Sequence, residues 1–355
     1  MNSSFAIAAD AVRPVDDGAA RAAAEHHDRL TKPRGSLGAV EALGGRLAAI
    51  ARISPPPVPE PVTVAVFAGD HGVVAEGVTP WPQEVTAQMV ANFCAGGAAV
   101  NVLARHCGAA VVVVDVGVAT DIPIESDTLL RRRVRNGTGD LAREPAMTAA
   151  ECRAALDIGA QVAADAVAGG ARLLVTGDMG IGNTTPSAAL IAALTATPAP
   201  EVTGRGTGID DATFARKTAV VEQALSRLPT AAPAETVLAE LGGLEIAALT
   251  GFVVGAAAAG VPVVVDGVIS LAAAVVADAL VPAVRGYLIA GHRSTEPGAS
   301  VALAHLGLDP VVDLGLRLGE GTGAVLAVPI VQAAAKILRE MATFDGAGVT
   351  DKDGA

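Results

Sequence analysis

A single acid, Glu320, stands between glycines in the stretch LRLGEGTGA (residues 316–324), and an apolar run follows it. An acid in such a turn is either a solvated surface residue or a group that meets a bound molecule. A carboxylate near a ligand can act as a general base. The stretch alone leaves both interpretations open.

Aspartates close three of the β-branched runs in the chain. The runs VTVAVFAGD, ARLLVTGD and VPVVVD end at Asp70, Asp178 and Asp266. In open parallel sheets the ligand lies beyond the carboxyl ends of the strands. We therefore expect these aspartates to lie at the edge of the sheet that binds the ligand.

A glycine-rich turn joins a predicted strand to a predicted helix in VTGDMGIGNTTPSAALIAAL, residues 175–194. Thr184 or Thr185 lies near the expected N-cap, and Pro186 lies near the first helical turn. Backbone N–H groups at such a helix start form an anion site, and small residues let a phosphate approach. A tight, well-capped turn without a ligand is the alternative.

A second glycine-rich loop, GRGTGIDD (204–211), opens another predicted helix, which carries Lys217. Lysines on helices are usually solvated, so a phosphate contact by Lys217 is a hypothesis. His71 in GDHG and His292 in GHRSTEPG lie on loops near strand ends. Each histidine is either functional or a hydrogen-bonding partner of its own loop backbone.

Several common sites are missing from the sequence. No G-x-G-x-x-G follows the first predicted strand, and no G-x-x-x-x-G-K-[ST] or H-E-x-x-H motif is present. The three cysteines have no C-x-x-C spacing, which suits a reducing cytoplasm and argues against structural zinc. The sequence therefore favours neither a standard NAD enzyme nor a P-loop NTPase, and it predicts no metal and no cofactor.

Composition narrows the classes of partner. The 355 residues are 51% hydrophobic but only 2% aromatic, and 25 basic against 37 acidic residues give a net charge of −12. Nucleic acid and anionic membrane are therefore unfavourable partners, and the run RRRVR (131–135) is predicted to be a solvated face. The N-terminus lacks the basic and apolar regions of a signal peptide.

One uncharged segment, 246–265, has about the ~20 residues that a membrane span needs. Its glycines and Pro262 divide it, so we predict a buried helix that ends at Gly260, followed by a short strand.

The remaining pattern is that of an α/β protein. Residues 1–52 have helical spacing, and the Pro-rich segment 53–62 is predicted to be a stiff linker. Four apolar runs, VTVAVFAGDHG, AAVVVVDVG, ARLLVTGDMG and VPVVVDGV, then alternate with Ala-rich helical stretches. Such alternation indicates a parallel sheet that helices cover on both faces.

Eight motifs, in order, resemble those of the nicotinate-nucleotide:dimethylbenzimidazole phosphoribosyltransferase family, which prepares the lower-ligand nucleotide of cobalamin. The resemblance covers residues 30–335. The motifs are TKPRGSLG (31–38), FAGDHGVVAEGV (67–78), PQEVTAQMVANF (82–93), GDMGIGNTT (177–185), GGLEIAALTG (242–251), VVVDGVIS (263–270), GHRSTEPG (291–298) and LRLGEGTGA (316–324).

The resemblance implies transfer of phosphoribose from nicotinate mononucleotide to dimethylbenzimidazole, with inversion at the anomeric carbon. The products are α-ribazole phosphate and nicotinate, in the nucleotide-loop branch of cobalamin biosynthesis. The leaving group is already a pyridinium, so departure needs no metal. The incoming base must lose a ring proton, and Glu320 matches the family's catalytic base, with flanking glycines that let a flat ring approach.

The resemblance also implies roles for the other site residues. Asp178 stands where many relatives have Glu and would be an auxiliary acid, Asp266 would bind the ribose hydroxyls, and Trp81 and Met89 would flank the benzimidazole. Trp81 replaces a small polar residue of some relatives. The phosphate would be held by Gly180, Gly182, Asn183, Thr184, Gly206, Lys217 and Ser294.

The resemblance further implies a large Rossmann-like α/β substrate-binding domain (60–310) and a small helical domain built from both chain ends (1–59 and 311–355). It implies a cytoplasmic homodimer without nucleic acid or membrane partners. Two alternatives stay open: the same transfer to another azole or purine base, and a non-catalytic sensor of nucleotide phosphate. An oxidoreductase is disfavoured by the missing dinucleotide motif.

Overall fold

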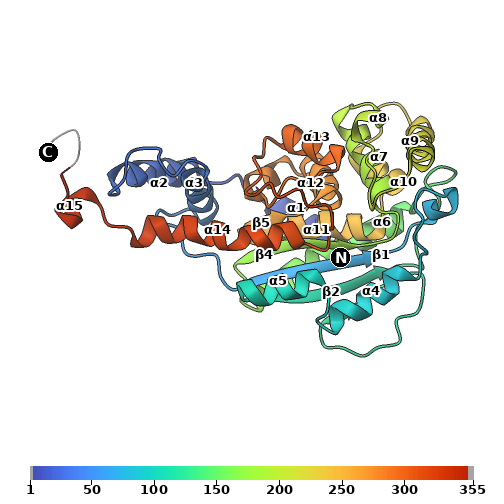
Figure 1. The fold of residues 1–355 in the computed structure, drawn as a ribbon, viewed down its shortest axis with the longest axis horizontal. Coiled ribbons are helices and arrows are strands. Elements are labelled where there is room, and N and C mark those ends of the chain that lie inside the picture. Colours follow the sequence, from blue (N-terminus) through green and yellow to red (C-terminus); the bar gives the residue numbers. More distant parts are fainter. Residues whose placement is uncertain (1–2, 351–355) are drawn as a thin grey trace.

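A twisted parallel sheet forms the centre of the protein (Figure 1). The computed structural model describes residues 3–350. In that part of the chain six strands lie in the order β3-β2-β1-β4-β5-β6, and every neighbouring pair is parallel. The strands are β1 (Val62–Gly69), β2 (Ala109–Gly117), β3 (Leu129–Arg131), β4 (Leu173–Met179), β5 (Val263–Val265) and β6 (Leu288–Ala290).

The strand order reverses between β1 and β4, because the chain builds one half of the sheet outward from β1 and the other outward from β4. This switch point is where open α/β sheets bind ligands. The four strands predicted from the apolar runs are confirmed as β1, β2, β4 and β5. The edge strands β3 and β6 were not predicted, since three residues carry too little pattern to be recognised.

The basic run 131–135 begins on edge strand β3. Arg131 and Arg132 are exposed, as predicted for a solvated face. Arg133 instead turns back and pairs with the buried carboxylate of Asp115 at 2.9 Å. The run is therefore partly a structural anchor for the edge of the sheet.

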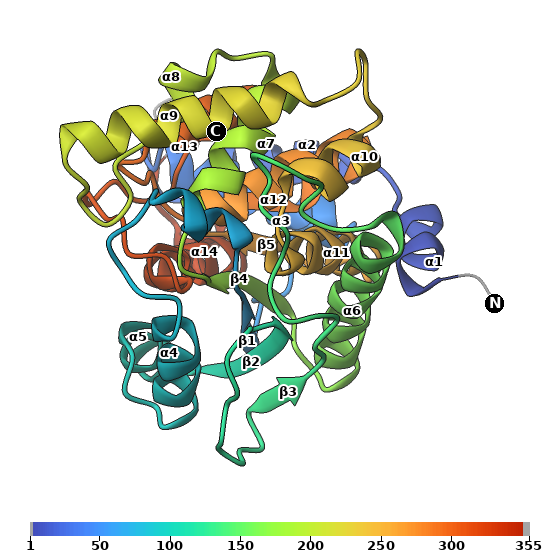
Figure 2. The same ribbon diagram turned by 90° about the vertical axis from the view of Figure 1, so that its right-hand side faces the viewer.

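Helices cover both faces of the sheet (Figure 2). Two separate hydrophobic clusters fill the layers between the helices and the sheet. Successive β1 residues alternate between them: Ala65 and Phe67 belong to one cluster, and Val64 and Val66 to the other. The first layer holds α6 (Ala149–Ala168), α7 (Thr184–Thr195), α10 (Ala234–Leu241), α11 (Leu244–Ala258), α12 (Val268–Leu280) and α13 (Pro297–Leu306). The second holds α4 (Val85–Cys94), α5 (Ala99–Cys107) and α14 (Thr322–Glu340).

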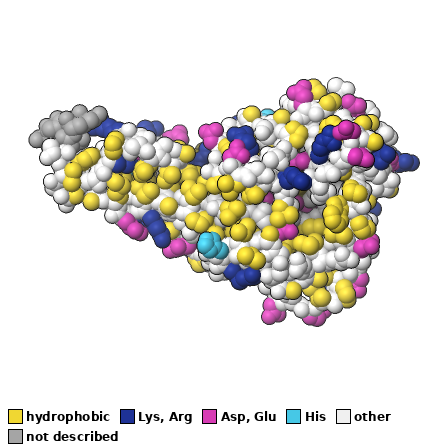
Figure 3. Space-filling model, in the orientation of Figure 1, with side chains coloured by type: hydrophobic (Ala, Val, Ile, Leu, Met, Phe, Trp, Pro, Cys, Tyr) yellow, Lys and Arg dark blue, Asp and Glu magenta, His cyan; other side chains and the backbone are white. Residues whose placement is uncertain are grey.

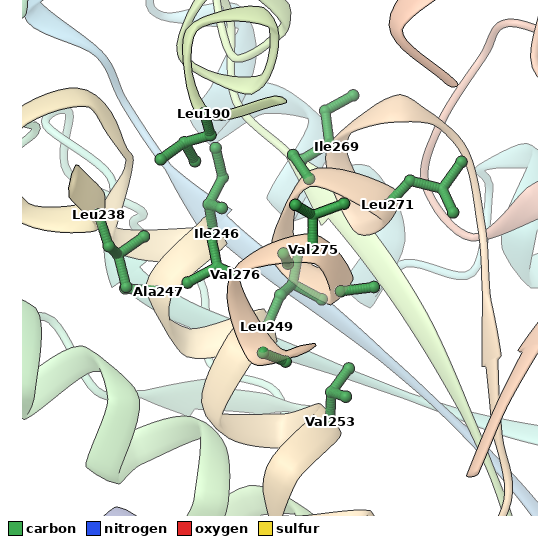
Figure 4. Close-up of a cluster of buried hydrophobic side chains, with 14 of the residues drawn as sticks. Leu190, Leu238, Ile246, Ala247, Leu249, Val253, Ile269, Leu271, Val275 and Val276 are labelled. Carbon is green, nitrogen blue, oxygen red and sulfur yellow. The ribbon is translucent and has the colours of Figure 1, made fainter. Parts of the chain in front are cut away.

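Helix α11 is the buried helix predicted within 246–265, and β5 is the strand predicted after it. Every residue of α11 from Leu244 to Ala257 is buried. Its side chains interlock with those of α12, with Leu190 of α7 and Leu238 of α10 beside them (Figure 4). A helix that is apolar all round belongs in a protein core, and α11 lies there.

Two helical stretches of the described residues, 85–107 and 322–340, are long and apolar enough to cross a membrane by length and composition. The first consists of α4 and α5, which the turn at 95–98 separates. The second is α14, which packs on β4 and β5. Buried core helices can also be this long and apolar. Since α14 packs on the sheet, its apolar composition is explained by that packing.

Both ends of the chain contribute helices beside the sheet. Helices α2 (Asp17–Arg29) and α3 (Ala39–Ala51) pack against the C-terminal half of α14 and extend away from the sheet (Figure 1). Helix α1 (Ser4–Ala11) instead packs on α6 and α11. The division into domains at 60 and 310 remains a prediction.

The remaining short elements lie around these layers. They are the 3₁₀ turns η1 (Gly72–Glu76) and η2 (Pro282–Tyr287), and the helices α8 (Ala199–Val202), α9 (Asp211–Ser226) and α15 (Phe344–Ala347).

Candidate active site

A cavity of about 400 Å³ opens at the carboxyl edge of the sheet. Loops after β1, β4, β5 and β6 line it, together with the segment 317–320 and Lys217 of α9. Eleven of the twelve predicted site residues line this cavity: Trp81, Met89, Asp178, Gly180, Gly182, Asn183, Thr184, Gly206, Lys217, Ser294 and Glu320. The twelfth, Asp266, does not.

The loop after β4 forms a nest at the start of α7. Gly182 has a φ of 90°, a left-handed conformation that glycine adopts without strain. Helix α7 begins at Thr184 with Asn183 as its N-cap, one residue before the predicted cap, and no side chain caps its first turn. The first N–H groups of a helix lack intrahelical partners, so this end of α7 is suited to an anion.

Lys217 lies between the two glycine-rich loops. Only 2% of the residue is exposed, so the usual solvated position of a helical lysine does not apply here. Its Nζ donates hydrogen bonds to Thr184 Oγ1 at 2.8 Å and to Gly204 O at 3.0 Å. Burial lowers the pKa of Lys217 to about 8, although the nearby carboxylate of Glu296 opposes the shift.

Three side chains hold the second glycine loop in place, and two of them, Glu296 and Arg317, lie outside the predicted set. The N–H of Gly206 donates to Glu296 Oε1 at 2.8 Å, and Arg317 Nη1 donates to Gly206 O at 2.9 Å. The indole N–H of Trp81 donates to Thr207 Oγ1 at 3.0 Å. Glu296 and Arg317 both line the cavity, and both occur within motifs quoted above, GHRSTEPG and LRLGEGTGA.

Glu320 is held in a tight turn between β-sheet and helix α14. Its φ is 65°, a left-handed conformation that costs a non-glycine residue roughly 1–2 kcal/mol. Its Oε2 accepts a hydrogen bond from the backbone N–H of Val100 at 3.3 Å, and the residue is 6% exposed. Burial raises the pKa of Glu320, the Val100 contact opposes the shift, and the charge of Asp266 adds to it. A carboxylate with a raised pKa is a stronger base.

Asp266 lies beneath the cavity and contacts the turn that carries Glu320. Its Oδ2 accepts from the N–H of Gly321 at 3.1 Å, and its Oδ1 accepts from the N–H of Ala324 at 2.9 Å. The residue is completely buried. Both carboxylate oxygens therefore satisfy the start of α14, whereas the predicted role in ribose binding remains a prediction.

Asp178 is buried beside Glu320 and faces the same cavity. Its Oδ2 accepts from the side-chain amide of Asn183 at 3.0 Å, while Oδ1 has no partner within residues 3–350. Burial raises the pKa of Asp178 well above its usual range, and the carboxylates of Asp266 and Glu245 add to the shift. Burial and neighbouring carboxylates thus both favour the protonated form of this side chain over the charged form.

The two histidines singled out from the sequence are both buried. His292 lines the cavity, and its Nε2 lies 3.4 Å from Asp266 Oδ1. His71 pairs instead with Glu245 at 2.8 Å, outside the cavity lining. For neither ring does the described part of the chain provide a backbone hydrogen bond.

Two of the eight sequence motifs contribute no residue to the cavity lining, and one of them, GGLEIAALTG (242–251), lies at the start of the buried helix α11. TKPRGSLG (31–38) connects α2 to α3, and none of its residues line the cavity of the same chain.

Comparisons with known proteins show the family to which the chain belongs. A family model described as phosphoribosyltransferase matches residues 12–349. Proteins of Salinispora tropica and Chloroflexus aurantiacus, both named nicotinate-nucleotide–dimethylbenzimidazole phosphoribosyltransferase, are 57% and 54% identical to this chain. Each alignment covers 96% of this chain. The alignments cover 98% of the Salinispora protein and 97% of the Chloroflexus protein. A crystal structure of the enzyme of that name from Thermus thermophilus superimposes with a TM-score of 0.90 at 47% identity, covering 95% of this chain and 99% of that one.

Proposed function

This chain belongs to the phosphoribosyltransferase family that the comparisons define, and on that premise we propose its substrates and the roles of its residues. The donor is nicotinate mononucleotide and the acceptor is dimethylbenzimidazole. The products are α-ribazole phosphate and nicotinate.

One observation carries this proposal: a buried base and an anion site share a single cavity. Glu320 lies at one part of the lining, and Lys217 with the two glycine loops lies at another. A nucleotide whose phosphate rests on the loops can present its anomeric carbon toward the acid residues. The geometry therefore suits transfer of a group that carries its own phosphate.

The reaction balances without a further reactant. The bond between the anomeric carbon and the pyridinium nitrogen breaks, and its electron pair neutralises that nitrogen as nicotinate leaves. A ring nitrogen of dimethylbenzimidazole forms the new bond on the opposite face of the ribose. Glu320 accepts the proton from the other ring nitrogen, and its raised pKa strengthens it for this task.

Asp178 acts beside Glu320 as an auxiliary acid. Asp178 lines the cavity and its buried Oδ1 has no partner in the described part of the chain, so the carboxyl, when protonated, can donate a hydrogen bond to a ligand. The side chain is one methylene shorter than the Glu of many relatives, and Asn183 fixes its other oxygen. We assign it an auxiliary role.

The acceptor ring occupies the apolar part of the cavity. Trp81, at the mouth, is 48% exposed, and Met89 and Met179 line the wall nearby. Flat aromatic and soft thioether side chains suit a flat apolar ring.

The wider organisation is also part of the proposal. Leu326, Ile330, Ala333 and Ile337 form an incompletely buried apolar stripe along α14, and Figure 3 shows hydrophobic side chains gathered over this end of the molecule. Such a stripe supports a homodimer of this chain, which light scattering after size exclusion would test. The free cysteines suit a reducing cytoplasm.

The decisive experiment incubates the purified protein with nicotinate mononucleotide and a panel of azole and purine bases, with and without EDTA. We expect nicotinate release and one dominant nucleotide, the dimethylbenzimidazole product, identified by mass spectrometry. A different dominant product would identify another lower-ligand base. Binding of the nucleotide without its consumption would reveal a sensor instead of an enzyme.

A further inference from the structure

His71 and Glu245 form an ion pair beside residues 180–182, the part of the glycine-rich turn before α7 that is here called the phosphate loop. His71 Nε2 lies 2.8 Å from Glu245 Oε1, and both side chains are fully buried. His71 follows β1, and Glu245 lies in the first turn of α11. Neither residue lines the cavity. The pair thus connects the end of the central strand to a buried core helix without reaching a ligand.

Glycines enclose the pair closely. A Cβ atom on Gly180 would lie 3.2 Å from His71 Nε2, and one on Gly69 would lie 3.2 Å from Glu245 Oε2. A Cβ atom on Gly243 would lie 2.5 Å from both His71 Cε1 and Glu245 Oε2. The imidazole therefore packs directly against the backbone at Gly180 and Gly243, and Gly69 O, the nearest atom to the same Cβ position on Gly180, lies against that glycine as well.

The next two residues of the loop rest on neighbouring supports. The N–H of Ile181 donates to Thr86 Oγ1 at 3.1 Å. A Cβ atom on Gly182 would lie 2.9 Å from a methyl group of Val74, which belongs to η1, the turn that His71 caps. Glycine has little conformational preference of its own, so these contacts determine where the loop N–H groups point.

Stability alone does not account for this pair. Burying two charges costs several kcal/mol per ion, which their attraction offsets only with good additional hydrogen bonds. Here His71 Nδ1 and Glu245 Oε2 have no hydrogen-bond partner in the described part of the chain. Burial lowers the pKa of His71, but the carboxylates of Glu245 and Asp70 raise it more, which favours the charged imidazolium beside Glu245.

We propose that His71 and Glu245 are positioning residues for the phosphate loop. Together they hold Gly180 and Gly182 in the conformation that presents the backbone N–H groups of Gly182 and of the start of α7 to a bound phosphate, while the N–H of Ile181 is satisfied by Thr86. This proposal rests on the function proposed above for the identity of the nucleotide. It does not need that function for the binding of a simple anion, which depends only on the loop.

The test is a double-mutant cycle on ligand affinity, with the variants His71→Gln, Glu245→Gln and both together. Calorimetry measures dissociation constants for inorganic phosphate, nicotinate mononucleotide and dimethylbenzimidazole. We expect each single variant to bind phosphate and nucleotide about 5- to 30-fold more weakly, and dimethylbenzimidazole within about twofold of the wild type. The double variant should lose no more phosphate affinity than the more strongly affected single variant. The effects of two substitutions are not additive when the two residues act as a unit.

A matched control is Asp278→Asn, which breaks the ion pair of Asp278 with Arg285, 2.6 Å apart, at the end of α12 far from the cavity. It should lower Tm and leave phosphate affinity unchanged. If His71→Gln does not fold, the phosphate affinity of the nearly isosteric variant Glu245→Gln tests the proposal.

Wild-type phosphate affinity in the His71 and Glu245 variants would overturn the proposal. Equal losses of affinity for all three ligands would also overturn it, and so would a double variant whose loss of phosphate affinity is the sum of the two single losses. The phosphate measurement requires no turnover. Absence of product with intact phosphate binding would therefore contradict only the proposed reaction.

Discussion

The ammonium group of Lys217 donates a hydrogen bond to Thr184 Oγ1 at 2.8 Å, and this contact joins two loops that are far apart in sequence. Thr184 begins α7 after the first glycine loop, and Lys217 lies on α9 after the second. One buried cation thus completes the proposed anion site, whose other donors are backbone N–H groups. Each loop alone would present only half of that site.

Lys217→Met should weaken binding of nicotinate mononucleotide by about 1.5–3 kcal/mol, the range for hydrogen bonds to charged groups. Methionine is a suitable replacement because it fills similar volume in a site that is only 2% exposed. Calorimetry measures the change. Dimethylbenzimidazole should bind as in the wild type, and equal losses for both ligands would indicate damage to α9.

The pH dependence of nucleotide binding follows from the same residue. The charged lysine binds phosphate, and the pKa of Lys217 in the free protein is lowered to about 8. Affinity should therefore be full below that pH and should fall as pH rises through it, by up to about tenfold per unit. Calorimetry from pH 6.5 to about 9.5 tests this, and Lys217→Met should lack the decline.

Glu320→Gln should lose about 10²–10⁴-fold in the chemical step, because glutamine cannot accept the ring proton. Its dissociation constant for nicotinate mononucleotide should change by less than about threefold, or ~0.7 kcal/mol. Single-turnover rates and calorimetry separate the two effects. Near wild-type turnover in the variant would make Asp178 the next candidate base.

The wild-type rate should rise with pH as Glu320 loses its proton. Because burial raises the pKa of Glu320, this limb should lie above the ordinary carboxyl range near 4.5. The deprotonated form is the active one, so activity is lost as pH falls through the raised pKa. Glu320→Gln should show no such limb in single-turnover profiles.

Asp266→Asn should reduce kcat more than it changes nucleotide affinity. The amide can accept from only one of the two N–H groups, Gly321 or Ala324, that the carboxylate now satisfies. An unpaired buried N–H costs about 1–3 kcal/mol, so Tm should fall as well. A loss of nucleotide affinity with unchanged Tm would instead support the role of Asp266 in ribose binding.

Trp81 should report base binding directly, since it is the only tryptophan in the chain and lies at the mouth of the cavity. Its emission should change and saturate during titration with dimethylbenzimidazole, because ring contact alters its environment. Inorganic phosphate should have little effect, and Trp81→Phe should abolish the signal. An unresponsive Trp81 would place the base elsewhere in the cavity.

Local sequence was sufficient for the main elements of this fold. Apolar β-branched runs predicted β1, β2, β4 and β5, since fully buried strands have a distinct composition. The glycine-rich turn at 177–185 predicted an anion site at a helix start, because that property depends on adjacent backbone groups. Short edge strands such as β6 carried no comparable signal.

Several properties of the site depended on contacts between distant parts of the chain. The burial of Lys217, the support of Gly206 by Glu296 and Arg317, and the capping of α14 by Asp266 each join separate segments. The same holds for the raised pKa of Asp178, which is caused by burial and by carboxylates from other elements. Residue types and spacing determined which groups this protein has available for chemistry. Their burial, partners and protonation arose only when the sheet brought its carboxyl ends together, because desolvation and electrostatic interaction depend on distance in space.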